Sequence, residues 1–217
     1  MKDYKSKLQP DRFYHIFNRA NGSERMFRNN DNYAYFLRRY KKYIDPIVKT
    51  YAYCLMPNHF HLLVQVRDEG ELWDAYEEKL RTDQRTNLPG APTKEGQRTN
   101  LRDFRNLEGF ATRQFSNFFN SYAKAYNKQY KRKGSLFMHT YKRLPITTQS
   151  QLQHTVIYIH QNPVKAKLAI YPKDWKFSSY KELISKDPSW LMKEECIELF
   201  DDLENFVRCH NASNSHG

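Results

Sequence analysis

The chain is poor in cysteine, lacks long apolar runs and has fewer acidic than basic residues. Its three cysteines, Cys54, Cys196 and Cys209, show neither the spacing of a metal site nor that of a disulfide framework. No apolar run among the 217 residues reaches the length of a membrane span, and the N-terminus has no signal-peptide pattern. These absences argue against a membrane or secreted protein and agree with a reducing cytoplasm.

The deficit of acidic residues gives the chain a strong positive charge. Lys and Arg number 36 against 24 Asp and Glu, so the net charge is +12. Such an excess suggests a polyanionic partner, most often nucleic acid, although a soluble protein can also simply be basic. The chain also has 16 Tyr and 14 Phe, and aromatic rings among Lys and Arg suit stacking on the bases of a single strand.

One segment near the C-terminus departs from this balance. Residues 186–210 contain three basic and seven acidic residues, a net charge of −4 that leaves +16 for the rest of the chain. Asp187-Pro188 predicts a helix start. An apolar stripe predicts packing against the domain: Trp190, Ile197, Phe200, Leu203, Phe206 and Val207. We predict an acidic helical extension over 186–210 and a polar tail over 211–217. The acidic face either competes with DNA for a basic groove or only caps the domain.

The hydrophobic periodicity predicts an α+β fold for residues 1–185. In chain order we predict a strand over 12–20, a helix capped by Asp31, strands over 47–55 and 59–66, a helix over 104–130, an extended segment over 136–146, and a helix over 148–162 that ends at Pro163. The order β-α-β-β-α-β is that of the ferredoxin-like split βαβ arrangement. Its central antiparallel sheet would have the third strand near the middle.

Residues 81–101 differ in composition from their surroundings. The pentapeptide QRTNL occurs at 84–88 and again at 97–101, with two prolines and two glycines between the copies. This composition predicts a flexible surface insertion.

Residues 56–65, MPNHFHLLVQ, carry the strongest chemical signal. The apolar run after the histidines favours a strand, on which alternate side chains share a face. His59 and His61 would then point to one side and Phe60 into the core. Two imidazoles on a rigid strand form part of a metal site, and a third ligand must come from elsewhere. An H-x-H pair also occurs without any metal.

The last predicted helix offers a partner for these histidines. Tyr158 and Asn162 are four residues apart and share a helix face. They would provide a phenolic nucleophile one turn from an amide oxygen, which suits a hard divalent ion such as Mg²⁺ or Mn²⁺. The alternative is an ordinary helix with a tyrosine at its edge.

Three stretches together resemble a known family. MPNHFHLLV (56–64) resembles the HUH motif, histidine–bulky hydrophobic–histidine, of single-tyrosine transposases. YIHQNPVKAKLA (158–169), followed by DWKFSSY (174–180), is similar to the downstream signature of REP-associated tyrosine transposases. YNKQYKRKGSLFMHTYK (126–142) resembles the basic R-x-G-x-L-W segment of that group, with Phe137 where Trp is more usual. The resemblance covers residues 12–66 and 104–180.

The resemblance implies an HUH nuclease fold with a nucleophile-bearing helix. It further implies recognition of single-stranded DNA beside a hairpin, such as a REP-like palindrome, and cleavage through a 5′-phosphotyrosine intermediate with Mg²⁺ or Mn²⁺. Carried over by position, His59 and His61 are metal ligands and Tyr158 is the nucleophile. Asn162 matches the polar residue that completes the metal site, where some relatives have Gln. The resemblance also implies a monomer rather than a dimer. It further implies a location in the cytoplasm, associated with the nucleoid.

Basic and polar residues in the first loop and around the end of the long helix are the expected DNA contacts. These are Asn18, Arg19, Asn21, Arg25, Lys131, Arg132, Lys133, Lys142 and Arg143. Arg28, Arg38 and Arg39 are further phosphate candidates. A solvated surface charge is the alternative for each basic residue.

Two other functions compete with a metal-dependent strand transferase. A domesticated relative can hold hairpin DNA or structured RNA without cutting, but such a module need not keep His59, His61 and Tyr158 together. A replication initiator or relaxase-type nickase uses the same chemistry, often with extra domains or a second tyrosine in the motif, and the sequence has neither.

Overall fold

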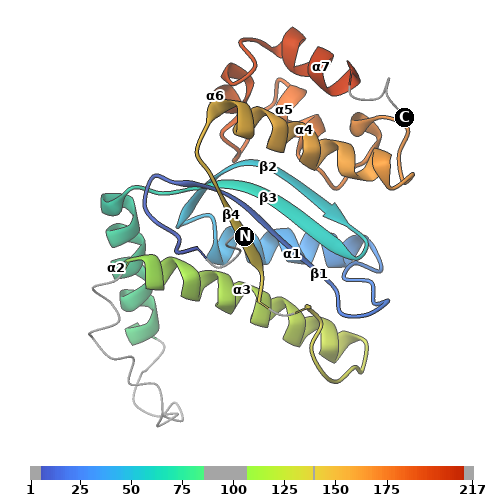
Figure 1. Cartoon of the computed structure of the whole chain (residues 1–217). Coiled ribbons are helices and arrows are strands. Elements are labelled where there is room, and N and C mark those ends of the chain that lie inside the picture. The colour runs from blue at the N-terminus through green and yellow to red at the C-terminus, as the bar shows by residue number, and fades with distance from the viewer. Residues whose placement is uncertain (1–5, 86–106, 139, 213–217) are drawn as a thin grey trace.

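A four-stranded antiparallel sheet organises the chain (Figure 1). The structure is a computed structural model that describes residues 6–85, 107–138 and 140–212. The strands are β1 (Phe13–Arg19), β2 (Val48–Met56), β3 (His59–Val66) and β4 (Lys142–Ile146), in the order β2-β3-β1-β4. β1 and β3 are therefore the central strands, which confirms the predicted ferredoxin-like arrangement.

Side chains alternate between the two faces of the central strands. On β1, Tyr14 and Ile16 are buried on one face, while His15 and Phe17 lie half-buried on the other. The register places Phe17 directly opposite His61 of β3. Because residues opposite each other in a sheet share a face, His15, Phe17 and His61 lie on the same side.

Two helices cover the face that carries Tyr14 and Ile16 (Figure 1). They are α1 (Asn30–Tyr43) and α3 (Leu107–Gln129), and α2 (Glu69–Arg85) lies against α3. Phe36 of α1 joins this layer to the sheet, since its ring lies 5.4 Å from Phe60 and 4.8 Å from Phe118. α3 buries one stripe of side chains in this layer: Leu107, Ala111, Phe115, Phe118, Tyr122 and Tyr126.

The opposite face is covered by the C-terminal third of the chain (Figure 1). Its elements are α4 (Gln149–Lys165), the 3-10 turn η2 (Pro172–Asp174), α5 (Tyr180–Ile184), α6 (Lys193–Glu198) and α7 (Leu203–Ala212). α4 packs on β2 and β3. Leu191, Phe200 and Phe206 of the acidic segment are buried in the common core, so this segment packs as an integral part of the fold. None of the helices in the described ranges is long and apolar enough to cross a membrane.

Two helix boundaries differ from their predictions. α1 is capped by Asn29, whose side-chain oxygen accepts the Asn32 N–H at 3.0 Å, and Asp31 lies in the first turn instead. α4 continues past Pro163 to Lys165. A proline in the last turn removes one backbone donor, but the residues after it can still donate to earlier carbonyls. The N–H of Ala166 does so to Asn162, at 2.9 Å.

The acidic segment does not begin as a helix at Asp187-Pro188. α6 starts at Lys193, because the Met192 N–H donates to the Thr50 carbonyl of β2 at 2.9 Å and holds the preceding residues irregular. The predicted helical extension therefore consists of two short helices, α6 and α7.

Part of the predicted insertion is helical. Residues 81–85 form the end of α2, a helix that the sequence analysis did not predict. An ion pair one turn apart, between Arg81 and Glu77 at 3.0 Å, supports this end of the helix. Residues 86–101, and the predicted start of the long helix at 104–106, lie outside the described residues.

A buried chain of hydrogen bonds, the histidine relay, fastens α7 to α4 and the sheet. His210 Nδ1 lies 2.7 Å from the Phe206 carbonyl oxygen, and its Nε2 lies 2.9 Å from His160 Nδ1. His160 Nε2 lies 2.8 Å from the Ser179 hydroxyl, which accepts the Tyr53 N–H at 2.8 Å. Since a carbonyl only accepts, His210 donates to Phe206 and, as a neutral ring, accepts from His160. His160 Nε2 is then an acceptor for the Ser179 hydroxyl, which also lies 3.2 Å from the Tyr53 carbonyl oxygen.

The relay makes folding stability depend on pH. Burial lowers the pKa of His210 to about 4 and holds that of His160 well below its usual range. On acidification, the unfolded chain therefore takes up protons first, and the free energy of unfolding falls below about pH 6.5. We expect the free energy of unfolding, measured with urea, to decline from pH 6.5 toward pH 4. In His210→Gln, the slope of this decline should be smaller by about 1.4 kcal/mol per pH unit.

The same substitution at the exposed His154 of α4 controls for the loss of an imidazole. His154→Gln should keep the wild-type slope. A free energy of unfolding that stays level between pH 6.5 and pH 4.5 would contradict a neutral, buried relay.

Candidate active site and nucleic-acid interface

The two histidines of the H-x-H motif lie at the start of β3. His61 is buried and His59 is half-buried, with their ring centroids 5.2 Å apart. Phe60 points to the other face and packs on Phe36, as the strand alternation predicts. The histidines therefore share the face of the sheet that α4 covers.

α4 brings Tyr158 and Asn162 to these histidines. The Tyr158 ring stands edge-on to His61 with centroids 5.3 Å apart, and 42% of the residue's surface is exposed. Asn162, one turn later, hydrogen-bonds to His59 and also donates from Nδ2 to the Tyr158 carbonyl at 2.7 Å. The four residues come from two distant parts of the sequence and meet at one end of the sheet.

Two amide groups flank His59. Its Nδ1 lies 2.7 Å from Asn58 Oδ1. Burial lowers the pKa of His59, and the hydrogen bond with Asn162 partly offsets this effect.

A third histidine, which the sequence analysis did not single out, completes the cluster. His15 Nε2 lies 2.9 Å from His61 Nδ1, and the His15 ring centroid lies 5.8 Å from that of Tyr158. Burial lowers the pKa of His15 to about 4; burial and the neighbouring His15 and His59 lower that of His61 to about 2. Both rings are therefore neutral at pH 7. The signal in the sequence is only the strand alternation of FYHIFNR, in which His15 stands alone.

The donor atoms fit a divalent metal only if an amide oxygen takes part. In the described ranges, no three His, Cys, Asp or Glu side chains are placed to hold a metal ion together. His59 and His61 offer ring nitrogens on one face, and the Asn162 amide is hydrogen-bonded to His59. Mn²⁺ accepts nitrogen and oxygen ligands, so this donor set suits Mn²⁺ better than Mg²⁺. The metal itself stays a prediction.

Two basic loops lie side by side near the end of β1. The first loop (20–29) and the second loop (130–138) are joined by the Ala20–Phe137 bridge and by the Asn21 N–H, which donates to the Leu136 carbonyl at 2.9 Å. We call their exposed basic and polar residues the two-loop surface: Arg19 at its edge, with Asn21, Arg25, Lys131 and Lys133. The structure thus brings together two segments that the sequence analysis proposed separately.

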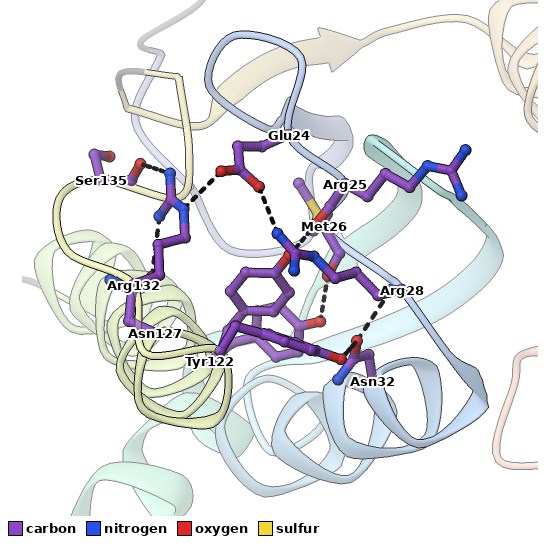
Figure 2. A network of polar contacts seen from close by, with 11 residues as sticks. Glu24, Arg25, Met26, Arg28, Asn32, Tyr122, Asn127, Arg132 and Ser135 are labelled. Atoms are coloured by element: carbon purple, nitrogen blue, oxygen red, sulfur yellow. Dashed lines mark hydrogen bonds and ion pairs between the residues drawn. The ribbon is translucent and has the colours of Figure 1, made fainter.

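Figure 2 shows how the loops are fixed to each other. Glu24 forms ion pairs with Arg132 at 2.9 Å and with Arg28 at 3.1 Å. The Tyr122 hydroxyl of α3 donates to the Met26 carbonyl at 2.7 Å, and the first loop is therefore held against the helix. The side chain of Arg25 projects away from this network, as DNA contact would require (Figure 2).

Three of the nine residues predicted to contact DNA are not exposed. Arg132 is engaged by Glu24, Asn127 and the Ser135 carbonyl, which makes it a tie between the loops. Asn18 is buried and lines a groove of about 570 Å³ against α3.

The prediction that Arg143 contacts DNA needs the clearest correction. Arg143 is buried against α3, with Nη1 3.1 Å from the Thr112 hydroxyl and 3.3 Å from that of Tyr141. Its position in β4 puts it on the core face of the strand, where a phosphate has no access. Lys142, the preceding residue, is exposed.

The sequence analysis missed a basic and apolar turn beside Tyr158, which we call the 165–176 turn. The chain turns at Lys167, with φ of 56°, and leaves Leu168, Ile170 and Tyr171 45%, 74% and 48% exposed. Four exposed lysines surround these residues: Lys165, Lys167, Lys173 and Lys176. Lys165 Nζ lies 5.7 Å from the centre of the Tyr158 ring, so the turn borders the site. Apolar residues between lysines in KAKLAIYPKDWK were the available signal.

Comparison with known proteins supports the fold. The sequence matches no protein-family model and no curated relative. The structure is similar to a solved structure of a REP-associated tyrosine transposase bound to a REP hairpin, with a TM-score of 0.56 and 12% sequence identity, over 86% of this chain and 87% of that chain. At this identity, the likeness establishes the α+β fold and leaves the activity of this chain to be argued from its own residues.

The correction at Arg143 can be tested by stability. Arg143→Met removes a buried charged donor from Thr112 and Tyr141, and we expect a loss of about 2–4 kcal/mol in the free energy of unfolding. Lys142→Met, at the exposed neighbouring position, should change it by less than about 0.5 kcal/mol. Urea unfolding of both variants measures this, and equal small effects would return Arg143 to the phosphate candidates.

Proposed function

We propose that this protein is a single-stranded DNA strand transferase, which cleaves beside a hairpin through a covalent bond to Tyr158. The observation that carries the proposal is the meeting of Tyr158 and Asn162 from α4 with His59 and His61 from β3. A binding protein has no need for an exposed tyrosine against a pair of neutral histidines. The solved structure of similar fold is described as a transposase bound to a REP hairpin, which agrees with this class of substrate.

The proposed reaction is an exchange of one phosphate ester for another. The Tyr158 oxygen attacks the phosphorus, the new O–P bond forms, and the bond from phosphorus to the 3′-oxygen breaks. The phenol loses its proton to solvent, and the leaving oxygen gains one to become a 3′-hydroxyl. The DNA 5′-phosphate stays on the tyrosine. Attack by a second 3′-hydroxyl reverses these steps and rejoins strands without ATP.

His59, His61 and Asn162 would hold a divalent metal, which supplies positive charge to a non-bridging phosphate oxygen. The chain's own residues hold the nucleophile in position. α4 is packed on the sheet and held by the histidine relay, so Tyr158 sits on a rigid element. A fixed nucleophile suits an in-line displacement, in which small misplacements of the reacting atoms are costly.

The positive charge of the two-loop surface and of the 165–176 turn gives DNA two places to bind. Phosphate contacts fix the position of the strand, and exposed apolar or aromatic side chains can stack on unpaired bases. We therefore place the duplex or its flank on the two-loop surface and the cleaved single strand along the 165–176 turn.

The central test is formation of a covalent adduct. The protein is incubated with Mn²⁺ and single-stranded hairpin oligonucleotides taken from DNA that flanks its own gene, and adducts are resolved on a denaturing gel. We expect a protein–DNA band that is absent in Tyr158→Phe and in His59→Ala. Tyr171→Phe, at an exposed tyrosine of the 165–176 turn, is the matched control and should keep the band.

A band that survives in Tyr158→Phe would show that another residue is the nucleophile. Tight hairpin binding with no band from the wild-type protein would instead favour the non-cutting DNA- or RNA-binding module.

The role of the 165–176 turn has its own test. Loss of stacking on one base costs about 1–3 kcal/mol, so Ile170→Ser combined with Tyr171→Ser should weaken binding of a fluorescent oligo(dT) by about five- to a hundredfold. Tyr158→Phe is used as the background, which keeps cleavage out of the measurement. Leu203→Ser, at an exposed apolar residue of α7, is the control and should bind like the parent. Equal affinities would remove the turn from the proposed DNA path.

A further inference from the structure

We infer that His15 is a positioning residue, which accepts the Nδ1 proton of His61 and so directs the Nε2 lone pair of His61 toward the metal. The inference rests on the proposed function and adds to it a residue outside the motifs that suggested it. The 2.9 Å contact between His15 Nε2 and His61 Nδ1 carries the argument.

The proposal follows from counting protons on the rings. A neutral imidazole carries one proton, on one of its two nitrogens. A nitrogen–nitrogen contact of 2.9 Å requires one proton between the two atoms. If that proton belongs to His15, His61 must carry its own proton on Nε2 and has no lone pair there to bind a metal. If it belongs to His61 Nδ1, Nε2 is available.

His59 shows the second arrangement, and its acceptor decides which nitrogen carries the proton. Its Nδ1 lies 2.7 Å from Asn58 Oδ1, and an amide oxygen can only accept. The proton of His59 is therefore on Nδ1, and Nε2 is left for the side where Asn162 lies. A histidine that binds a metal typically donates its other N–H to a neighbouring acceptor. Asn58 and His15 occupy equivalent positions, behind His59 and His61 respectively.

Ring contacts and strand pairing hold His15 next to His61. Its ring is packed between Phe17, at a centroid distance of 4.8 Å, and Tyr158, at 5.8 Å. β1 fixes its backbone, since His15 pairs with Leu63 across the sheet and Phe17, two residues on, pairs with His61. His15 therefore holds the His61 ring at a set angle as well as in a set tautomer.

The test begins with the tautomer itself, in the metal-free protein. Nitrogen-15 NMR of the histidine side chains at pH 7 distinguishes a protonated Nδ1 from a protonated Nε2. We expect His61 in the wild-type protein to carry its proton on Nδ1 and to become a mixture of tautomers in His15→Phe, which keeps a ring but lacks an acceptor. A wild-type His61 protonated on Nε2 would overturn the inference.

Metal affinity provides the second measurement, with Mn²⁺ alone as the probe. Loss of such an outer partner typically weakens metal binding about 10- to 100-fold, which we expect for His15→Phe by titration calorimetry. His15→Gln places an amide oxygen near the former Nε2 and should restore most of the affinity. Phe17→Leu alters ring packing on His61 but leaves the hydrogen bond, so its dissociation constant should stay within about twofold of wild type.

Equal Mn²⁺ affinity in His15→Phe and wild type would overturn the inference, as would a His15→Gln variant as weak as His15→Phe. These results are separate from the fate of the proposed function. If the wild-type protein binds no Mn²⁺ or forms no DNA adduct, the proposed reaction fails, and the tautomer of His61 still decides the role of His15.

Discussion

The pairing of β1 with β3 is the constraint on which the candidate site depends. It places Phe17 opposite His61 and Arg19 opposite His59, and it brings His15 within hydrogen-bond distance of His61. A shift of one residue would turn the β1 side chains to the other face, and His15 would enter the aromatic core beneath α1 and α3. The strand order also matters, because the two central strands have neighbours on both sides and cannot easily slip. The histidines of the site thus lie on the two central strands of the sheet.

Much of the fold was predictable because its signals are local. The strand over 59–66 and the long helix each follow from one periodicity, and both were confirmed over their described residues. The pairing of His59 and His61 with Tyr158 was proposed from family resemblance together with a helix spacing, and the structure brings the three rings together. Boundaries failed where a competing interaction acted over long range, as at Lys193, whose preceding residue is held by Thr50 of β2.

The missed and corrected residues share a physical reason. His15 gains its role from a partner on another strand, and Arg143 loses its expected role because its strand face is covered by α3. Neither fact is encoded in the spacing of nearby residues. Arg132 is similar, since Glu24 is far from it in sequence and adjacent in space. A sequence pattern can identify a charged residue, but burial and pairing decide whether the charge is available to a ligand.

The histidine relay has a consequence for the order in which the chain is synthesised. His160 on the nucleophile helix is completely buried and finds its acceptor in His210, fifty residues later. At about 5–20 residues per second, the ribosome needs several seconds to deliver that partner. During this interval the Nδ1–H of His160 has no acceptor within a dry core, which opposes firm docking of α4 on the sheet. Firm docking of the helix that carries Tyr158 therefore waits for His210, so the cluster around His61 becomes complete only after residue 210 has been made.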